Sequence, residues 1–187
     1  QAEPDFEVVA WDGDGPQTRA ELLEFVRGAD GLVTLLTERV DAELLAAAGP
    51  QLRGVSNVAV GYNNIDVAAC RDANVVVTNT PGVLTEATAD IAMSLLLMVT
   101  RRLAEGERVI RSRTKWQWGM FYLLGTGIQG RRLGIIGMGA IGQAVARRAK
   151  AFGMETVYTN VTRVPPEVEA ELGATYVSQD ELLATSD

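Results

Sequence analysis

The chain has 187 residues, 47% of them hydrophobic, so it is long enough and apolar enough to form one packed domain or two small ones. Its formal net charge of −7 at pH 7 argues against the basic surface that nucleic acids and anionic membranes attract. We therefore expect a globular protein with neither a nucleic-acid partner nor a membrane partner.

Neither a membrane span nor a secretory signal is visible in the sequence. The longest apolar run, residues 91–99, is about half as long as a bilayer requires, so we expect a buried helix there. The first residues, QAEPDFEVV, lack both the basic and the apolar region of a signal peptide. Cys70 is the single cysteine and no histidine exists to activate it, so we expect a buried, unreactive thiol and a cytoplasmic location.

The first part of the chain alternates short β-branched runs with helical patterns. Parallel neighbours in a sheet need a crossover connection, and an intervening helix supplies it. Such a sheet is normally covered by those helices. The pattern predicts strands at residues 6–11, 31–36, 54–60 and 74–79, with helices at 18–26 and 41–48.

Residues 85–112 show an uninterrupted helical pattern that separates two α/β units. Apolar residues recur at helical spacing, and Thr85 is a suitable first residue. We expect one long helix there, belonging to a second domain of residues 80–187 that follows a first domain of residues 1–79. A less regular, aromatic-rich segment, TKWQWGMFYLLGTGIQG, comes after this helix.

A glycine-rich turn follows the short apolar strand LGIIG, and the helix QAVARRAKAFG comes directly after it. Gly137, Gly139 and Gly142 complete the spacing G-x-G-x-x-G, and a further strand, METVYTN, comes next. In that context the first glycine makes a tight turn, the second admits a diphosphate, and the third lets helix and strand pack closely. The alternative is a purely structural turn. We expect dinucleotide binding by Gly137, Met138, Gly139, Ala140, Ile141 and Gly142.

The residues after METVYT should decide which dinucleotide is bound. An acidic residue there would bind the ribose 2′-hydroxyl group of NAD and repel the 2′-phosphate of NADP. The chain instead has Asn160, Val161, Thr162 and Arg163, which favours NADP(H) and leaves NAD(H) possible. The alternative interpretation of Arg163 is a solvated loop charge.

Three segments resemble motifs of the D-2-hydroxyacid dehydrogenase family, most closely those of its glyoxylate and hydroxypyruvate reductase branch. They are SNVAVGYNNIDV (56–67), VVVTNTPGVLTEATADIAMSLLLMVTRR (75–102) and LGIIGMGAIGQAVARRAKAFGM (133–154). The resemblance implies an α/β fold with a flavodoxin-like substrate domain, incomplete here. It also implies the first half of a Rossmann-type, doubly wound cofactor domain.

The resemblance also implies roles for individual residues. Val60 and Gly61 lie in the loop that presents backbone amides to the substrate carboxylate in such enzymes, although a plain turn after a strand is the alternative. Thr88 matches a position near the nicotinamide. Trp118 matches a position that some relatives project into the substrate pocket of the neighbouring subunit, and we favour an ordinary packing role for it and for Trp116.

No catalytic residue can be assigned in this chain. In the family a histidine, a glutamate that tunes it and a substrate-binding arginine belong to motifs that would follow Asp187, and this chain has no histidine. The sequence also departs from the family pattern in two places. Relatives that use NADP often have arginine where Val161 stands, and many have histidine where Gln129 stands; we attach no catalytic role to Gln129.

The resemblance implies hydride transfer from NAD(P)H to a 2-oxoacid, with glyoxylate or hydroxypyruvate favoured, in a homodimer joined along the helix that starts at Thr85. One alternative is an enzyme like phosphoglycerate dehydrogenase, and another is a non-enzymatic, dinucleotide-sensing corepressor. The 187 residues alone are expected to be inactive and to fold poorly, because part of a parallel sheet leaves apolar surface uncovered.

Overall fold

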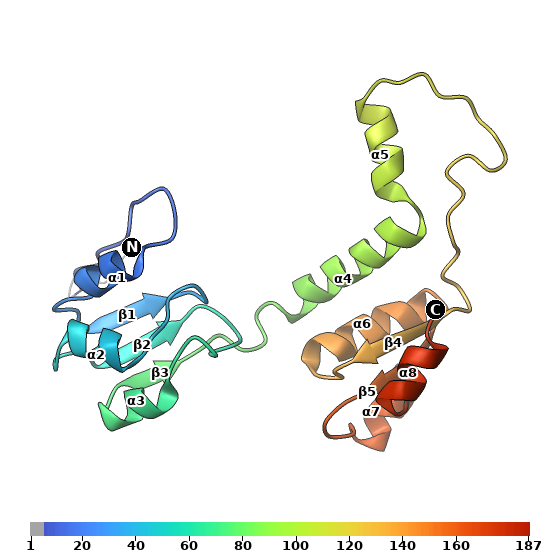
Figure 1. The fold of residues 1–187 in the computed structure, drawn as a ribbon. Helices are drawn as coiled ribbons and strands as arrows, with labels where there is room; N and C mark the ends of the chain where they lie inside the picture. Colours follow the sequence, from blue (N-terminus) through green and yellow to red (C-terminus); the bar gives the residue numbers. More distant parts are fainter. Residues whose placement is uncertain (1–5) are drawn as a thin grey trace. The chain divides into compact units, whose positions relative to one another are not determined.

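The computed structural model describes residues 6–187 and divides into two compact units, one ending at Pro81 and one running from Gly82 to Asp187 (Figure 1). Each unit contains a three-stranded parallel sheet. The predicted α/β class with parallel sheets is confirmed.

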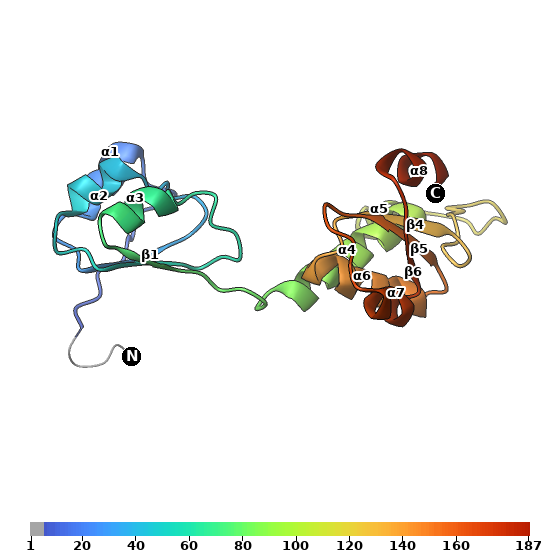
Figure 2. The same cartoon turned by 90° about the horizontal axis from the view of Figure 1, so that it is seen from below.

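The sheet of the first unit has the strand order β1-β2-β3. Its strands are β1 (Gly31–Thr34), β2 (Gly54–Asn57) and β3 (Val76–Thr78). The helices α1 (Arg19–Phe25), α2 (Ala42–Ala48) and α3 (Val67–Asp72) lie on one face of this sheet (Figure 2). Three of the four predicted strands and both predicted helices are present, with shorter bounds. Helix α3 is not among the predicted elements, although Asp66 caps its first turn.

Local sequence explains where these helices start. The Thr18 side chain accepts from the amide of Glu21, and the Glu21 carboxylate accepts from the amide of Thr18. This capping box satisfies backbone donors that the first turn of a helix leaves free. Asp41 caps α2 in the same way, by accepting from the amide of Leu44.

The core of the first unit lies between these helices and the sheet. Val40, Leu44, Val55 and Cys70 are all buried there. Burial of a side chain such as Leu44 contributes roughly 1.5–3 kcal/mol to folding. The expectation of a buried thiol is confirmed, and burial raises the pKa of Cys70, which makes a thiolate less accessible.

The predicted strand at residues 6–11 is wrong. The chain has no regular structure there, and Phe6, Val8 and Val9 expose 71%, 73% and 69% of their surface. β-Branched residues favour a strand only where a neighbouring strand completes the hydrogen-bond ladder. Within the described residues no strand pairs with this segment.

The second unit has the strand order β4-β5-β6, formed by β4 (Arg132–Ile136), β5 (Glu155–Thr159) and β6 (Ala174–Tyr176). Helices α6 (Ala140–Ala151) and α7 (Pro166–Leu172) lie on one face and α8 (Gln179–Thr185) on the other (Figure 2). Successive side chains of β5 point to opposite faces of the sheet, so helices can pack on both faces. Tyr158 packs with the cluster that includes Met138 and Leu172, whereas its neighbour Val157 packs with Leu182 of α8.

The single helix predicted over residues 85–112 is wrong, because two helices occupy this range. They are α4 (Thr85–Thr100) and α5 (Leu103–Arg111). Arg102 lies between them with φ at 54°, in the left-handed region, which no α-helix tolerates. The carbonyl of Thr100, released at the end of α4, accepts from the amide of Thr126 at 2.7 Å. The periodicity continues through the break, so apolar spacing alone could not reveal it.

Among residues 6–187, no helix combines the length and the hydrophobicity that a membrane crossing would need.

Candidate functional site

The glycine-rich turn joins the end of β4 to the start of α6. Gly137 has φ at 102°, a conformation that side-chain-bearing residues rarely adopt. Its amide donates to the carbonyl of Thr159 at 2.9 Å, which ties the turn to the end of β5. The glycine is therefore required by the backbone geometry of the turn.

The other two glycines of the motif meet different surroundings. A β-carbon on Gly142 would overlap the carbonyl oxygen of Gly137, so helix and strand could not approach as closely with any other residue. A β-carbon on Gly139 would point into open space. Met138, between them, is buried in the core, so its side chain packs and only its backbone is available to a ligand.

The N-terminus of α6 presents free hydrogen-bond donors. The amides of Ala140, Ile141 and Gly142 have no acceptor within residues 6–187, and no side chain caps the helix. The helix dipole adds partial positive charge at this end, and Arg148 and Lys150 complement the opposite end. Free amides, open space above Gly139 and a favourable dipole fit the diphosphate group of a dinucleotide.

The end of β5 carries the residues expected near the adenosine ribose. Val161 is fully exposed, and the Asn160 side chain donates to the carbonyl of Thr162. Arg163 is not a free loop charge: its Nε and Nη2 atoms donate to Oε1 and Oε2 of Glu169 at 2.8 and 2.7 Å. The Tyr158 hydroxyl donates to the same carboxylate at 2.7 Å. These hydrogen bonds lower the pKa of Glu169 from 4.5 to about 2.

The loop that follows β2 holds Val60 and Gly61. Neither residue's amide finds an acceptor in the described part of the chain. The loop is held by its carbonyl groups, because the side chains of Asn79 and Asn57 donate to the carbonyls of Val60 and Gly61 at 2.8 and 2.9 Å. Asn57 is buried and also accepts from the Thr34 hydroxyl at 3.0 Å. Two free amides on an anchored loop can bind a carboxylate without adding bulk.

Thr88 lies half-buried in the first turn of α4. This turn is joined to α6 by Arg148, whose Nη2 atom lies 2.8 Å from Oε2 of Glu86 and 2.7 Å from Oδ1 of Asp90. Within the second unit, α4 is thus fixed to the helix that starts at the glycine turn. Residues Val60 and Gly61 belong to the first unit, and Thr88 and the glycine turn to the second.

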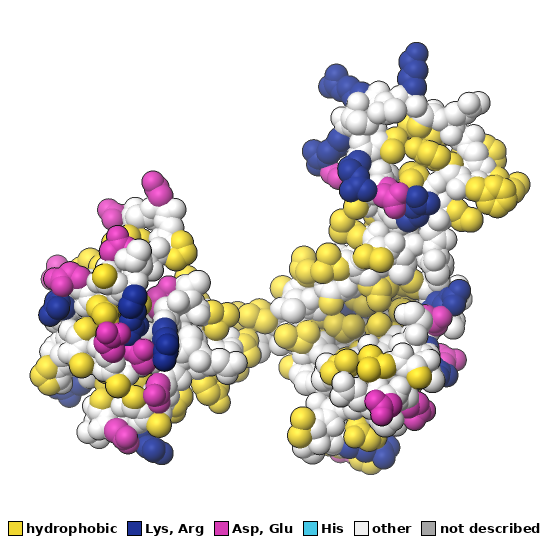
Figure 3. All heavy atoms as spheres, viewed as in Figure 1, with side chains coloured by type: hydrophobic (Ala, Val, Ile, Leu, Met, Phe, Trp, Pro, Cys, Tyr) yellow, Lys and Arg dark blue, Asp and Glu magenta, His cyan; other side chains and the backbone are white. Residues whose placement is uncertain are grey.

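The two tryptophans of the aromatic segment differ in their surroundings. Trp116 stacks on Tyr122, with ring centroids 6.0 Å apart and planes 3° from parallel. Trp118 exposes 78% of its surface, so the expected packing role is wrong for Trp118 within one chain. Met120 and Phe121 are also exposed, and hydrophobic side chains gather on this segment beyond α5 (Figure 3).

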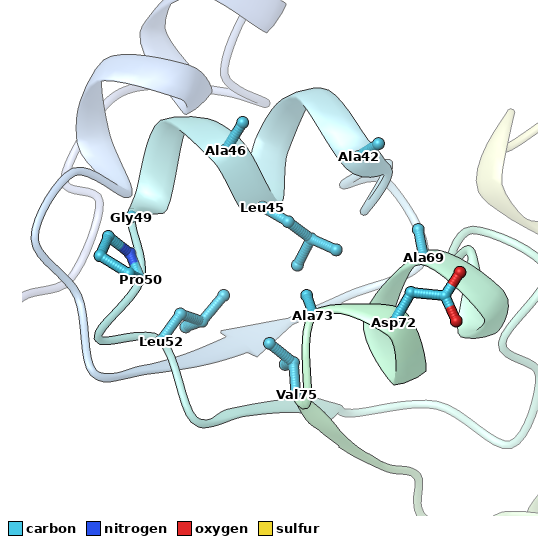
Figure 4. A pocket seen from close by; sticks show the side chains of 10 residues that line it. All are labelled: Ala42, Leu45, Ala46, Gly49, Pro50, Leu52, Ala69, Asp72, Ala73 and Val75. Atoms are coloured by element: carbon cyan, nitrogen blue, oxygen red, sulfur yellow. The ribbon is translucent and has the colours of Figure 1, made fainter.

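A separate shallow groove lies between α2 and α3 (Figure 4). Ten residues line it: Ala42, Leu45, Ala46, Gly49, Pro50, Leu52, Ala69, Asp72, Ala73 and Val75. Asp72 is the one charged member, and neither the glycine turn nor the loop of Val60 contributes to it. It offers no evident chemistry. Likewise, no group of three acidic, cysteine or histidine side chains that could hold a metal ion occurs in the described residues.

The sequence model of one protein family, the D-isomer specific 2-hydroxyacid dehydrogenase catalytic domain, matches residues 1–184. The chain belongs to this family. Among curated members, a glyoxylate reductase of Thermococcus onnurineus is 50% identical over 97% of the chain and 55% of its own length. A glyoxylate reductase of Korarchaeum cryptofilum is 47% identical over 99% of the chain and 55% of its own length. The chain therefore spans about half the length of these relatives.

Solved structures of other proteins share this fold. A glyoxylate reductase from Paecilomyes thermophila is 37% identical, with a TM-score of 0.75, over 90% of the chain and 53% of its own length. A protein from Thermus thermophilus is 43% identical, with a TM-score of 0.85, over 92% of the chain and 54% of its own length. The family consists of oxidoreductases that act on CH–OH groups with NAD(P).

Sequence reasoning missed two residues that organise these sites. Asn57 anchors the loop of Gly61 from a buried position, and its place at the end of a strand was the only local signal. Glu169 binds Arg163 from the first turns of α7, a helix whose start is marked by Pro165 and Pro166. Both depend on contacts between separate elements.

Proposed function

We propose that the protein is an NAD(P)H-dependent glyoxylate reductase that reduces small 2-oxoacids to 2-hydroxyacids. The observation that carries the proposal is the combination of 50% identity to a glyoxylate reductase with a glycine turn whose amides are free. Hydroxypyruvate is the second substrate that we propose, since a carboxylate next to a carbonyl is the shared chemical feature.

The residues present fit a nicotinamide dinucleotide. The backbone from Gly137 to Gly142 would hold the diphosphate, and Asn160, Val161, Thr162 and Arg163 would line the ribose site at the end of β5. When bound, the cofactor supplies the hydride. The absence of a carboxylate at residues 160–163 supports use of NADPH, with NADH also accepted. Thr88 is proposed to lie beside the nicotinamide.

The free amides of Val60 and Gly61 are proposed to bind the substrate carboxylate. Backbone donors hold a fixed position, so they orient the substrate as well as bind it. The chain has no histidine, so we place the proton donor for the substrate oxygen in the remainder of the enzyme, together with its partner glutamate and the substrate-binding arginine.

We further propose a homodimer in which α4 and the exposed aromatic segment contribute to the subunit contact. The apolar side chains of Ile91, Leu95 and Val99 expose 61%, 56% and 78% of their surface along α4. Exposed apolar surface of this kind is typical of protein–protein contacts. Trp118 would then reach the substrate pocket of the partner subunit.

The test is an assay of the complete protein for glyoxylate-dependent oxidation of NADPH and of NADH. We expect turnover with both cofactors and faster turnover with NADPH. Oxidation with hydroxypyruvate or 3-phosphoglycerate but not glyoxylate would reassign the substrate within the family. Dinucleotide binding without turnover of any 2-oxoacid would overturn the proposal in favour of a dinucleotide-sensing protein.

A further inference from the structure

The carboxylate of Glu169 occupies one edge of the Arg163 guanidinium. Both carboxylate oxygens are used, because Oε1 accepts from Nε and Oε2 accepts from Nη2. The Tyr158 hydroxyl completes the environment of Oε1 at 2.7 Å, and Tyr158 itself is buried. The Glu169 side chain is only 12% exposed, whereas that of Arg163 is 60% exposed. The largely buried carboxylate of Glu169 thus holds the exposed guanidinium of Arg163 in place.

The remaining surroundings fix the orientation of that cation. The guanidinium lies over the ring of Tyr176, with its central carbon 5.5 Å from the ring centroid. Nη1 donates to no acceptor within the described residues, so its two N–H groups and the second N–H group of Nη2 are left for a ligand. Arg163 therefore stands in the loop after β5 with its Nε–Nη2 edge occupied and its Nη1–Nη2 edge available.

This arrangement has a direct consequence for a phosphate group at the ribose. Arginine binds phosphate most strongly when two parallel N–H groups meet two oxygens. In this structure Glu169 takes such a pair of N–H groups and also balances the positive charge. A 2′-phosphate could still meet the Nη1–Nη2 edge, but a guanidinium whose charge Glu169 balances would add little net attraction, whereas a 2′-hydroxyl group would not be penalised.

We propose that Glu169 is a positioning residue for cofactor selection, which balances the charge of Arg163 from one edge and so keeps the enzyme's preference for NADPH over NADH small. The inference rests on the proposed dinucleotide site and specifies how that site discriminates. The neutral isostere Glu169→Gln would release the charge of Arg163 to the cofactor and sharpen the preference.

The test measures dissociation constants of NADPH and NADH in the complete protein by fluorescence titration at fixed ionic strength. In the E169Q variant we expect NADPH to bind about tenfold tighter, as for one added charge-assisted interaction, while NADH changes less than about twofold. The double variant E169Q/R163Q should lose this gain. A matched control is E155Q, which removes an exposed carboxylate of the same strand β5 that pairs with Arg132 and should leave the ratio unchanged.

The outcomes separate this inference from the proposed function. Equal changes for both cofactors in E169Q, or an unchanged ratio, overturn the inference alone. No binding of either dinucleotide by the unaltered protein overturns the dinucleotide site and the inference with it. If E169Q does not fold, R163Q decides: a loss of NADPH affinity below about threefold supports the proposal, and a loss of about tenfold overturns it.

Discussion

The carbonyl oxygen of Gly137 stands where a β-carbon on Gly142 would have to lie. Gly137 directly follows β4 and Gly142 lies in the first turn of α6, so a β-carbon at residue 142 would force the helix away from the strand. Gly139, between them, faces open space. The three glycines of one motif therefore have separable roles, namely turn geometry, ligand access and close packing.

The substitutions Gly142→Ala and Gly139→Ala should have different effects. G142A forces helix and strand apart, and we expect a loss of about 1–3 kcal/mol in the free energy of unfolding together with weaker dinucleotide binding. G139A adds a methyl group where the diphosphate is proposed to lie, so stability should change little while binding is lost. Urea unfolding and NADPH titration of both variants test this. Equal stability of the two variants would contradict the packing role of Gly142.

The buried amide of Asn57 offers a second test, because it joins Thr34 of β1 to the loop of Gly61. Asn57→Ala leaves the buried Thr34 hydroxyl without its acceptor, which should cost about 1–3 kcal/mol of stability. The loop should also lose its anchor, so we expect KM for glyoxylate to rise more than kcat falls.

The neighbouring substitution Ser56→Ala serves as the control for Asn57. The Ser56 hydroxyl accepts from the exposed Thr78 hydroxyl at 2.9 Å. Loss of this hydrogen bond should change the free energy of unfolding by less than about 0.5 kcal/mol. If S56A and N57A raised KM equally, the anchoring role of Asn57 would be wrong.

The sequence alone predicted the features that depend on residues close together in the chain. The glycine turn was predictable because its three glycines and the flanking strand and helix are contiguous, and the caps at Thr18 and Asp41 mark helices that the sequence predicts. Features that depend on distant partners were not. The segment 6–11 has strand-like residues but no pairing strand in the described chain, and apolar spacing runs through the break at Arg102.

The pair of Arg163 and Glu169 shows the same limit within the site. The absence of a carboxylate directly after β5 is visible in the sequence, and it is the basis for expecting NADP(H). That Arg163 is engaged by a carboxylate six residues further on depends on the path of the chain into α7, which the sequence did not reveal. Residue type alone therefore overstated how free the cation is.

The exposed side chain of Val161 gives a prediction about cofactor preference. It is fully exposed beside Asn160 and Thr162, so a longer side chain meets no steric obstacle. Val161→Arg would add a guanidinium at the proposed ribose site, and we expect the ratio of kcat/KM for NADPH over NADH to rise about tenfold. Val161→Gln, of similar length and uncharged, should raise it much less. A ratio unchanged in V161R would move the ribose site away from this loop.

The lowered pKa of Glu169 predicts how stability depends on pH. Because the folded-state pKa is about 2 and the ordinary value is 4.5, the carboxylate stabilises the fold above about pH 4.5 and loses that effect as pH falls towards 2. The difference in unfolding free energy between the unaltered protein and E169Q should therefore shrink steadily over this range. Urea unfolding at several pH values from about 6 to about 2.5 measures it. A difference that stays constant across the range would show that Glu169 acts through packing and not through its charge.

Trp118 exposes 78% of its surface, so we expect this side chain to act in a contact with a second subunit. Removing an exposed side chain should change the free energy of unfolding of one subunit by less than about 0.5 kcal/mol. If Trp118 reaches the partner's pocket, Trp118→Ala should nevertheless raise KM for glyoxylate several-fold and leave the dissociation constant of NADPH unchanged. Trp116→Ala is the matched control, because Trp116 stacks on Tyr122 in its own chain. Steady-state kinetics and sedimentation velocity of both variants decide the matter, and a KM unaffected by W118A in a dimeric enzyme would remove Trp118 from the substrate site.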